Sequence, residues 1–324
     1  YLPAYFYVGG AAGAAAALGA AAQLATGKAS PGPWRRRVPG GEHRLVGRCR
    51  FIATGGAALS AVLLIADLGK PMRFLNMLRV FRPTSPMNMG TWILSAFGGA
   101  MGTSALPHLL PADPLRRRIS DAGALAGGLM GLPLCTYTGV LVANTAVPIW
   151  QQTRRTLPVL FAASGTAGAA SLLELWPPGG EGDRIVRRYA IAGKAMELLL
   201  GTVMEREARA VPRVARPLGR GASGALWRAS KAFTLAGLVA SAIATRRSTG
   251  LRRAAGVLGT LGSLSLRFAI MEAGRASARD PHATFDLQRA GRGARDVVTE
   301  KDQVGATYTA RRQYEAGMGA TESP

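Results

Sequence analysis

Cysteine, histidine and acidic residues are scarce in this 324-residue chain. It has two cysteines, Cys49 and Cys135, and three histidines, and its 18 Asp and Glu residues stand against 40 Lys and Arg residues. Two thiols are too few for an iron–sulfur cluster, which usually takes four, and they argue against a disulfide framework. His43, His108 and His282 cannot supply the two facing imidazoles that a haem within a membrane generally needs. We therefore expect no haem and no metal centre.

Charge is missing altogether from several long stretches, although the formal net charge of the chain is +22. A helix needs about 20 apolar residues to cross the ~30 Å hydrocarbon layer of a membrane. The runs that lack charge, apart from His108, are residues 1–27, 87–112, 122–153 and 157–173. Three of these runs are long enough to span a bilayer. The chain is therefore predicted to be a multi-pass protein of the cell (inner or plasma) membrane.

The apolar runs predict an all-α integral membrane fold with about eight transmembrane helices, which could form two four-helix bundles. The predicted spans are residues 2–26, 49–66, 90–110, 122–147, 157–176, 189–204, 232–246 and 253–271. Residues 1–271 then form a transmembrane helical domain. Residues 272–324 are polar and contain no apolar run, so they are predicted to be an extramembrane C-terminal tail.

The arginine clusters lie between these apolar runs. No aromatic residues interleave with them as a stacking surface for bases would need, so we expect contact with anionic lipid and no nucleic acid. An even number of spans places both termini on one side, here called side A, and the opposite face is side B. Loops 67–89, 148–156 and 205–231 also lie on side A. Both sides are rich in Lys and Arg, so the positive-inside rule does not identify the cytoplasmic one.

The loop after the second predicted span has an unusual pattern. Its apolar residues fall near helical spacing, with arginines between them, at Phe74, Leu75, Met77, Leu78 and Phe81. This pattern predicts a short amphipathic helix on the membrane surface. Pro83 and Pro86 are expected to end that helix. Trp92 is expected at interface depth, where the next span begins.

The whole segment 67–92, DLGKPMRFLNMLRVFRPTSPMNMGTW, resembles the DLGxPxRFxxMLxxxxxxSPMxxGxW signature of the NrfD/PsrC family, the polysulphide reductase membrane subunits. Residues 136–150 (TYTGVLVANTAVPIW) and residues 272–289 resemble the branch of that family found beside formate dehydrogenase-like subunits. The resemblance covers approximately residues 1–290.

The family resemblance implies eight or more helices in two bundles, without haem. It also implies a site for menaquinone or ubiquinone near the face that docks a ferredoxin-like iron–sulfur subunit, which in turn joins a molybdopterin catalytic subunit. The tail from Glu272 to Arg289 lies on side A and alternates arginine with acidic residues. We expect this segment to hold the iron–sulfur partner.

The family's quinone pocket uses polar residues of the first span, an acidic residue that ends the second, and a tyrosine of the fourth. Asp67 and Tyr137 match the last two, whereas the first-span Asn and His have no counterpart here. A carboxylate at the membrane edge and a phenol within the bundle suit quinone hydrogen bonding and protonation. Arg73 and Trp92 complete the candidate quinone-binding set. Alternatively, Asp67 pairs with Lys70 or Arg73, and Tyr137 is an interior packing residue whose hydroxyl is hydrogen-bonded to the backbone.

Charged residues within the predicted spans form a second candidate group. Lys194 and Glu197 lie one turn apart in the sixth span, and Glu174 ends the fifth. Charges in a span usually face the bundle interior, often in pairs, so Lys194 and Glu197 suit either a structural salt bridge or a proton path from side B, which Glu174 could join. Gln23 and Asn144 are weaker candidates that suit helix–helix hydrogen bonds.

These features predict the membrane-anchor and quinone-binding subunit of a multi-subunit oxidoreductase with no redox centre of its own. Electrons would pass between a partner's iron–sulfur cluster and the quinone pool. A purely structural anchor without its own quinone site is a second reading. An ion or solute carrier, coupled through Lys194 and Glu197, is a third.

Overall fold

The structure is a computed structural model that describes residues 1–25, 42–106, 113–245 and 248–283. The described residues contain helices and no β-strand. The long helices are α1 (Leu2–Ala25), α2 (Glu42–Leu68), α4 (Pro86–Ser104), α6 (Pro114–Ala143), α8 (Thr156–Leu175), α9 (Glu181–Arg209), α11 (Gly221–Ile243) and α12 (Thr249–Ala278). The short helices are α3 (Pro71–Leu78), α7 (Pro148–Gln152) and α10 (Pro212–Gly219).

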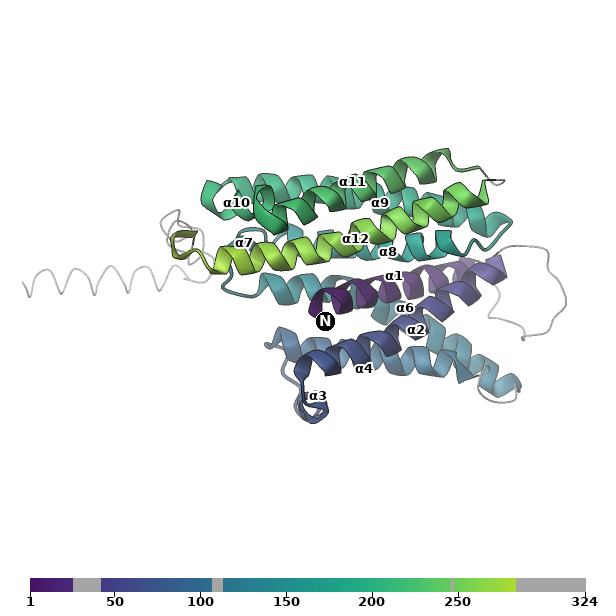
Figure 1. The fold of residues 1–324 in the computed structure, drawn as a ribbon. Coiled ribbons are helices and arrows are strands. Elements are labelled where there is room, and N and C mark those ends of the chain that lie inside the picture. Colours follow the sequence, from purple (N-terminus) through teal and green to yellow (C-terminus); the bar gives the residue numbers. More distant parts are fainter. Residues whose placement is uncertain (26–41, 107–112, 246–247, 284–324) are drawn as a thin grey trace, which may run out of the picture.

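The long helices form two four-helix groups that lie one above the other in Figure 1. The first bundle consists of α1, α2, α4 and α6, and the second consists of α8, α9, α11 and α12. Helix α8 packs against both α1 and α6, and α12 also contacts α1, which joins the two bundles. The short helices α3, α7 and α10 lie at the left-hand end of Figure 1, which is side A.

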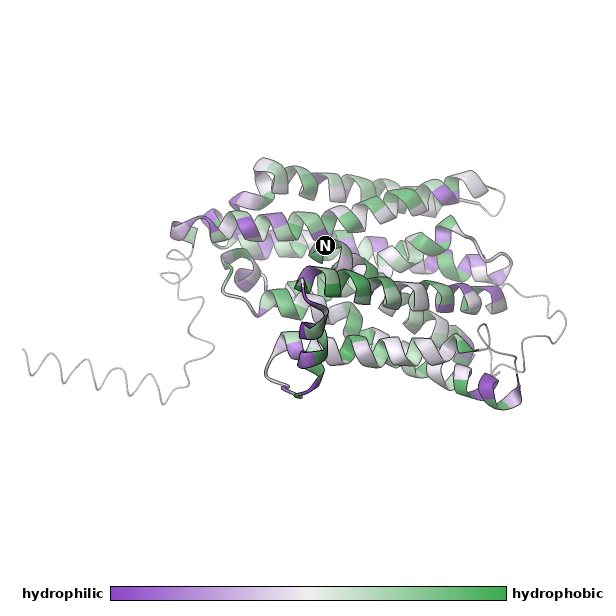
Figure 2. Ribbon diagram, turned by 60° about the horizontal axis from the view of Figure 1, so that its bottom comes forward, coloured by the Kyte–Doolittle hydropathy of each residue, from purple (hydrophilic) through white to green (hydrophobic). Residues whose placement is uncertain are grey.

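Five of the long helices are long and apolar enough to cross a membrane: α1, α2 from Arg44, α6, α8 and α12. Helices α4, α9 and α11 run alongside them in the same bundles. Figure 2 shows many of the hydrophilic residues near the helix ends, with hydrophobic residues between them. The prediction of an all-α membrane protein is confirmed, and each predicted span coincides with one long helix.

The ends of several helices differ from the predicted spans. Helix α6 begins at Pro114, well before the predicted start at 122, because Asp113 caps it by accepting a hydrogen bond from the Arg116 amide at 2.8 Å. Proline suits the first position of a helix because the missing N–H has no partner there anyway. Helix α12 continues to Ala278, so the chain stays helical beyond the predicted domain boundary at residue 272. Residues 284–324 of the predicted tail lie outside the described residues.

The amphipathic segment forms α3, but its end was predicted wrongly. The helix begins at Pro71 and ends at Leu78, before Phe81 and well before Pro83. Pro86 does not end a helix. It is the first residue of α4, where the Ser85 hydroxyl accepts a hydrogen bond from the Asn88 amide at 3.4 Å. A proline preceded by a capping serine is a typical helix start, so Ser85 and Pro86 mark the beginning of α4 and not the end of α3.

Helix α1 is the point where the two bundles meet, and glycines let its neighbours approach closely. An added Cβ on Gly13 would lie 2.5 Å from the Gly131 carbonyl oxygen of α6. A Cβ on Gly165 of α8 would lie 2.9 Å from the Gly10 carbonyl oxygen. Such close backbone approach is a common means of helix association in lipid. These contacts fix the depth of α1 relative to both bundles.

Candidate functional site

Tyr137 lies at the side-A end of the first bundle, between α6 and α4. Its side chain is buried, and its ring lies directly against Gly90 in the first turns of α4. A Cβ on Gly90 would overlap the ring, so only glycine leaves room for this phenol. The Tyr137 hydroxyl makes no hydrogen bond with the described part of the chain. Helix α4 therefore holds Tyr137 in place without occupying its hydroxyl.

A second phenol, Tyr5 of α1, lies near Tyr137. It is 1% exposed and close enough for the two phenols to interact electrostatically. The Tyr5 hydroxyl is also buried without a hydrogen-bond partner among the described residues. Buried hydroxyls are nearly always hydrogen-bonded, so the unpartnered Tyr5 hydroxyl marks a place where a polar ligand would be stabilised. Tyr5 was not predicted, because the resemblance implied an Asn and a His as the quinone-binding residues of the first span.

The other predicted quinone-binding residues lie in or beside α2, α3 and α4. Asp67 is exposed at the end of α2, and it forms no ion pair with the residues that the structure describes. The alternative in which Arg73 pairs with Asp67 is not observed, since Arg73 Nη1 donates to the Leu68 carbonyl at 3.1 Å. Trp92 is 37% exposed and packs edge-to-face on Phe81, with ring centroids 5.8 Å apart. Asp67, Arg73 and Trp92 are thus more exposed than Tyr137 and Tyr5.

Asn88 holds the connector between α3 and α4. Its side-chain oxygen accepts a hydrogen bond from the Arg82 amide at 2.7 Å, and its Nδ2 donates to the carbonyls of Met77 and Val80 at 2.6 and 2.9 Å. The side chain is buried and its hydrogen-bonding capacity is largely used. Its role was not predicted, although it lies within the quoted signature at SPMN. We regard Asn88 as a positioning residue for Gly90 and Trp92.

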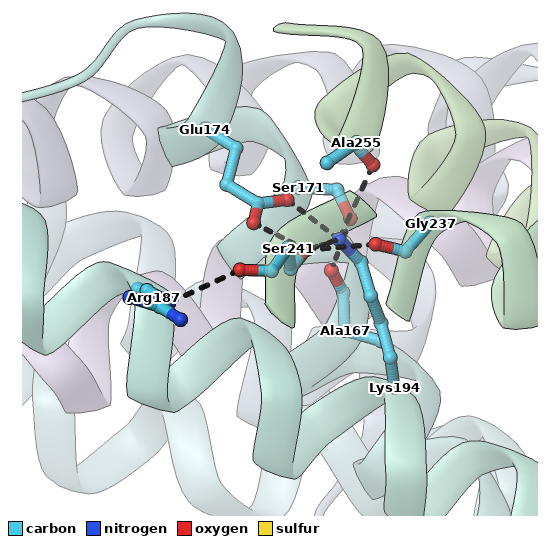
Figure 3. A network of polar contacts seen from close by, with 8 residues as sticks. All are labelled: Ala167, Ser171, Glu174, Arg187, Lys194, Gly237, Ser241 and Ala255. Carbon is cyan, nitrogen blue, oxygen red and sulfur yellow. Dashed lines mark hydrogen bonds and ion pairs between the residues drawn. The ribbon is translucent and has the colours of Figure 1, made fainter. Parts of the chain in front are cut away.

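The second bundle contains a buried ion pair, drawn in Figure 3. Lys194 of α9 is 0% exposed, and its Nζ lies 2.5 Å from Glu174 Oε2 of α8. Lys194 Nζ also donates to Ser241 Oγ at 2.8 Å and to the Ala255 carbonyl at 3.2 Å. Ser241 lies 2.6 Å from the second carboxylate oxygen, Glu174 Oε1. All three ammonium donors therefore have partners from three different helices.

Glu197, the next predicted charge along α9, is not the partner of Lys194. Its two carboxylate oxygens accept hydrogen bonds from the hydroxyls of Thr234 and Ser263, at 2.6 and 2.7 Å. The salt bridge considered between Lys194 and Glu197 is thus replaced by the pair of Lys194 with Glu174. Residues one turn apart on a helix can face different neighbours, and here the packing of α8 and α12 decides which acid reaches the ammonium.

Arg267 of α12 is a further buried charge that sequence reasoning missed. It is 1% exposed, its Nη2 donates to the Phe161 carbonyl at 2.9 Å, and its guanidinium lies 3.8 Å from the centre of the Phe161 ring. It interacts electrostatically with Glu197 and with Tyr7 of α1. The signal was present, since arginine within a predicted apolar span is rare and usually functional. Arg267 links the second bundle to α1.

At side B, an ion pair marks the entrance to the buried charges. Arg252 Nη1 lies 2.7 Å from Asp183 Oδ2, and both side chains are largely buried. They line a cavity of about 110 Å³. A smaller space of about 10 Å³, close to the size of one water, adjoins Asp183, Arg252, Arg187, Ser241 and Glu174. Glu174 is therefore separated from the side-B surface by little more than a water-sized gap.

The polar groups follow one another from side B toward side A. Glu174 lies near the side-B end of α8, Lys194 and Glu197 in the middle of α9, and Arg267 in the side-A half of α12. Tyr7, on the next helix, lies two residues from Tyr5. Lys194 thus contacts Glu174, and electrostatic interactions connect Lys194 to Glu197, and Glu197 to Arg267.

The two weaker polar candidates behave differently. Gln23 of α1 accepts a hydrogen bond from Arg50 Nη2 of α2 at 2.9 Å, and Arg50 also pairs with Asp121 of α6 at 2.7 Å. Gln23 therefore takes part in a helix–helix contact of the expected kind. Asn144 instead donates to the Val140 carbonyl of its own helix at 3.1 Å. Neither residue joins the series of charges in the second bundle.

Two helical bundles joined around α1, with spans apolar enough for a bilayer, define a multi-pass membrane protein. Within the described part of the chain, no group of three or more His, Cys, Asp or Glu side chains could hold a metal ion. The family model for polysulfide reductase, NrfD type, matches residues 43–279. The chain belongs to this family, whose members are membrane subunits of polysulfide reductase-like complexes. Comparisons with curated proteins and with solved structures gave no match.

Proposed function

We propose that this chain is the quinone-reactive membrane subunit of an oxidoreductase complex. In this role it anchors the complex in the lipid membrane and binds menaquinone or ubiquinone at the side-A end of the first bundle. Electrons pass between that quinone and the iron–sulfur cluster of a partner, while the chain itself carries no haem or metal. Family membership supports the role of membrane subunit. The phenol pair of Tyr5 and Tyr137 is the single observation that supports the quinone site.

The phenols suit a quinone because its ring carries two carbonyl oxygens that need hydrogen-bond donors. Tyr5 and Tyr137 offer two donors that make no hydrogen bond elsewhere in the described residues. Aromatic rings adjoin Tyr5, since it packs on Phe6 and Phe6 packs on Phe161 at centroid distances of 5.7 and 5.9 Å. An apolar wall with a few convergent donors is typical of sites for flat organic ligands. Asp67, exposed at the end of α2, is the group that would exchange protons with the side-A surface.

We further propose that the charged series in the second bundle carries protons between side B and the quinone. Reduction of a quinone takes up two electrons and two protons, and oxidation of a quinol releases them. Glu174 lies beside the water-sized space at side B, and Lys194, Glu197 and Arg267 follow at increasing depth. Ionisable side chains and hydroxyls in series are the usual components of a proton relay within a membrane. Protons could then reach the quinone from side B without passing through lipid.

The proposed partners are a ferredoxin-like iron–sulfur subunit and a molybdopterin catalytic subunit. They would dock on side A, where α3, α7 and α10 lie and where the quinone would receive or deliver electrons. Helix α12 projects to this side as far as Ala278, and Arg213 of α10 pairs with Asp280 at 2.9 Å just beyond it. The remaining part of the predicted docking tail, residues 284–289, lies outside the described residues.

The quinone site can be tested in the assembled complex, assayed with a quinone analogue and with a soluble dye that receives electrons directly from the catalytic partner. Tyr137→Phe and Tyr5→Phe each remove one donor, so we expect apparent quinone affinity to fall several-fold, about 1 kcal/mol for each bond. Asp67→Asn should lower quinone turnover and leave dye turnover unchanged. The matched control is Tyr189→Phe, because the Tyr189 hydroxyl donates to the Ala14 carbonyl away from the site.

Full quinone activity in Tyr5→Phe, Tyr137→Phe and their double variant would place the pocket elsewhere. The chain would then be a purely structural anchor without its own quinone site. Loss of dye activity in the same variants would show that the tyrosines support assembly of the complex. A loss of quinone activity of equal size in Tyr189→Phe would assign the effect to packing in general.

A further inference from the structure

A second pocket lies on side A of the second bundle, away from the phenol pair. It is a cavity of about 360 Å³ between α10, the first turn of α11 and the last turns of α12. Five arginines line it: Arg213, Arg216, Arg220, Arg275 and Arg279. Only two carboxylates do so, those of Glu272 and Asp280. The pocket is therefore strongly basic, and nothing in the proposed quinone chemistry uses it.

The carboxylates are already engaged. Arg213 binds Asp280 through two hydrogen bonds of 2.9 and 3.2 Å, and Arg275 Nη1 lies 2.6 Å from Glu272 Oε1. Hydrogen bonding to the Arg213 guanidinium lowers the pKa of Asp280 below its ordinary value, so this carboxylate stays ionised at neutral pH. The two ion pairs join α10 to the end of α12 and shape the pocket. The excess positive charge of the pocket therefore lies on the remaining arginines, Arg216, Arg220 and Arg279.

Three guanidinium groups in the pocket have no acidic partner among the described residues: Arg216, Arg220 and Arg279. All three side chains are exposed. Arginine binds phosphate oxygens in a bidentate manner, which makes a cluster of unpaired guanidinium groups a good phosphate site. The walls between them are small, at Gly221, Ala222 and Ala276. The cavity thus offers both the charge and the space for a phosphate group.

The outer face of α12 indicates what the phosphate is attached to. Val257, Leu261 and Phe268 are exposed, and they recur at helical spacing with Glu272, Arg275 and Arg279 on the same face. In a bilayer this apolar face contacts acyl chains, and it leads directly to the arginine pocket. A protein partner of side A would meet the arginines without needing the apolar stripe below them. A phospholipid matches both parts, with acyl chains along α12 and its headgroup in the pocket.

We propose that this pocket binds the phosphate headgroup of an anionic phospholipid, such as cardiolipin or phosphatidylglycerol. The lipid would fasten α10 and the first turn of α11 to the end of α12. Basic pockets at the ends of transmembrane helices are known to bind such headgroups. The site is separate from the quinone site, because its walls come from α10, α11 and α12 and not from the first bundle.

The test uses the full chain in detergent, with bound lipid measured by native mass spectrometry during titration with cardiolipin, phosphatidylglycerol or phosphatidylcholine. We expect one tightly held anionic lipid per chain, and at least about tenfold weaker retention of phosphatidylcholine. The double variant Arg216→Gln/Arg220→Gln should weaken anionic lipid binding about tenfold or more. The matched control Arg118→Gln/Arg253→Gln removes the same charge from exposed positions on side B and should leave binding unchanged.

A third variant, Ala276→Trp, keeps every arginine but fills the cavity, and it should displace the lipid as well. Equal losses in the side-A and side-B arginine variants would overturn the proposal, because attraction would then be general. Unchanged binding in Ala276→Trp would also overturn it, since the cavity would not be used. Displacement of the lipid by millimolar inorganic phosphate would assign the site to the free anion. Absence of any retained anionic lipid would leave the pocket to a protein segment.

Discussion

Replacing Lys194 tests whether the second bundle is built around a buried ion pair. In Lys194→Met the alkyl part of the side chain is kept, but Glu174 loses its closest partner at 2.5 Å and keeps only the Ser241 hydroxyl. Glu174 is 3% exposed, and the adjoining space has room for about one water, which carries no charge to replace the lost ammonium. Breaking a buried pair by removing one partner typically costs about 3–5 kcal/mol of stability. We expect a loss of unfolding free energy in this range.

The double variant Lys194→Met/Glu174→Gln separates charge from packing. The new side-chain amide would still accept a hydrogen bond from Ser241, and neither member of the pair would carry a charge, so most of the stability should return. Replacement of a buried ion pair by uncharged groups of similar volume is often close to neutral. We therefore expect the double variant to lie within about 2 kcal/mol of the unchanged chain. If this pair also belongs to a proton path, quinone turnover should stay low although stability has recovered.

The assay is denaturant unfolding of the purified chain in detergent, analysed as a double-mutant cycle. The control is Arg184→Met, which removes one member of the exposed pair with Glu181, where the two side chains are 55% and 49% exposed. Exposed pairs contribute about 0–1 kcal/mol. A cost for Lys194→Met no larger than that of Arg184→Met would refute the reasoning. So would a double variant that is as unstable as the single one, because the loss would then come from packing.

Two further predictions concern glycines that make room for site residues. Gly90→Val should destabilise the chain by about 1–3 kcal/mol and lower apparent quinone affinity, because a side chain there would displace the Tyr137 ring. Gly259→Ala should cost a similar amount, about 1–3 kcal/mol, since its Cβ would lie 2.5 Å from Lys194 Cε, and it should also lower quinone-coupled proton uptake. Gly98→Ala is the control for both, because nothing lies within 4 Å of the added Cβ; it should be neutral or slightly stabilising in the same unfolding assay.

The membrane fold could be predicted from the sequence because lipid imposes a simple rule on it. Backbone groups in hydrocarbon must be hydrogen-bonded within the chain, so an apolar run of sufficient length becomes a helix almost regardless of its neighbours. Each of the eight predicted spans therefore corresponds to one long helix, including the arginine-bounded α9 and α11. The ends were less predictable. Capping by Asp113 and Ser85 starts α6 and α4 before their predicted spans, and hydropathy does not register such local hydrogen bonds.

The predicted quinone-binding residues came from matching a linear signature, and the structure separates them by burial. Asp67, Arg73 and Trp92 are exposed, whereas Tyr137 is buried. Tyr5 was not predicted because nothing in the sequence distinguishes a ligand-binding tyrosine in an apolar span from one that only packs. Only the packing of α1 beside α6 brings its buried, unpartnered hydroxyl within electrostatic range of Tyr137.

The sequence by itself determined the class of protein, the number of long helices and the series of residues that carry charge into the membrane. These properties depend on composition along one dimension, because hydrophobicity and charge act on each segment separately. Only the tertiary structure decided that Lys194 pairs with Glu174 instead of Glu197, that Arg267 joins the same series, and that five arginines share one pocket. The physical reason is that burial and hydrogen-bond partners are set by neighbouring helices, whose rotation and depth no single span specifies.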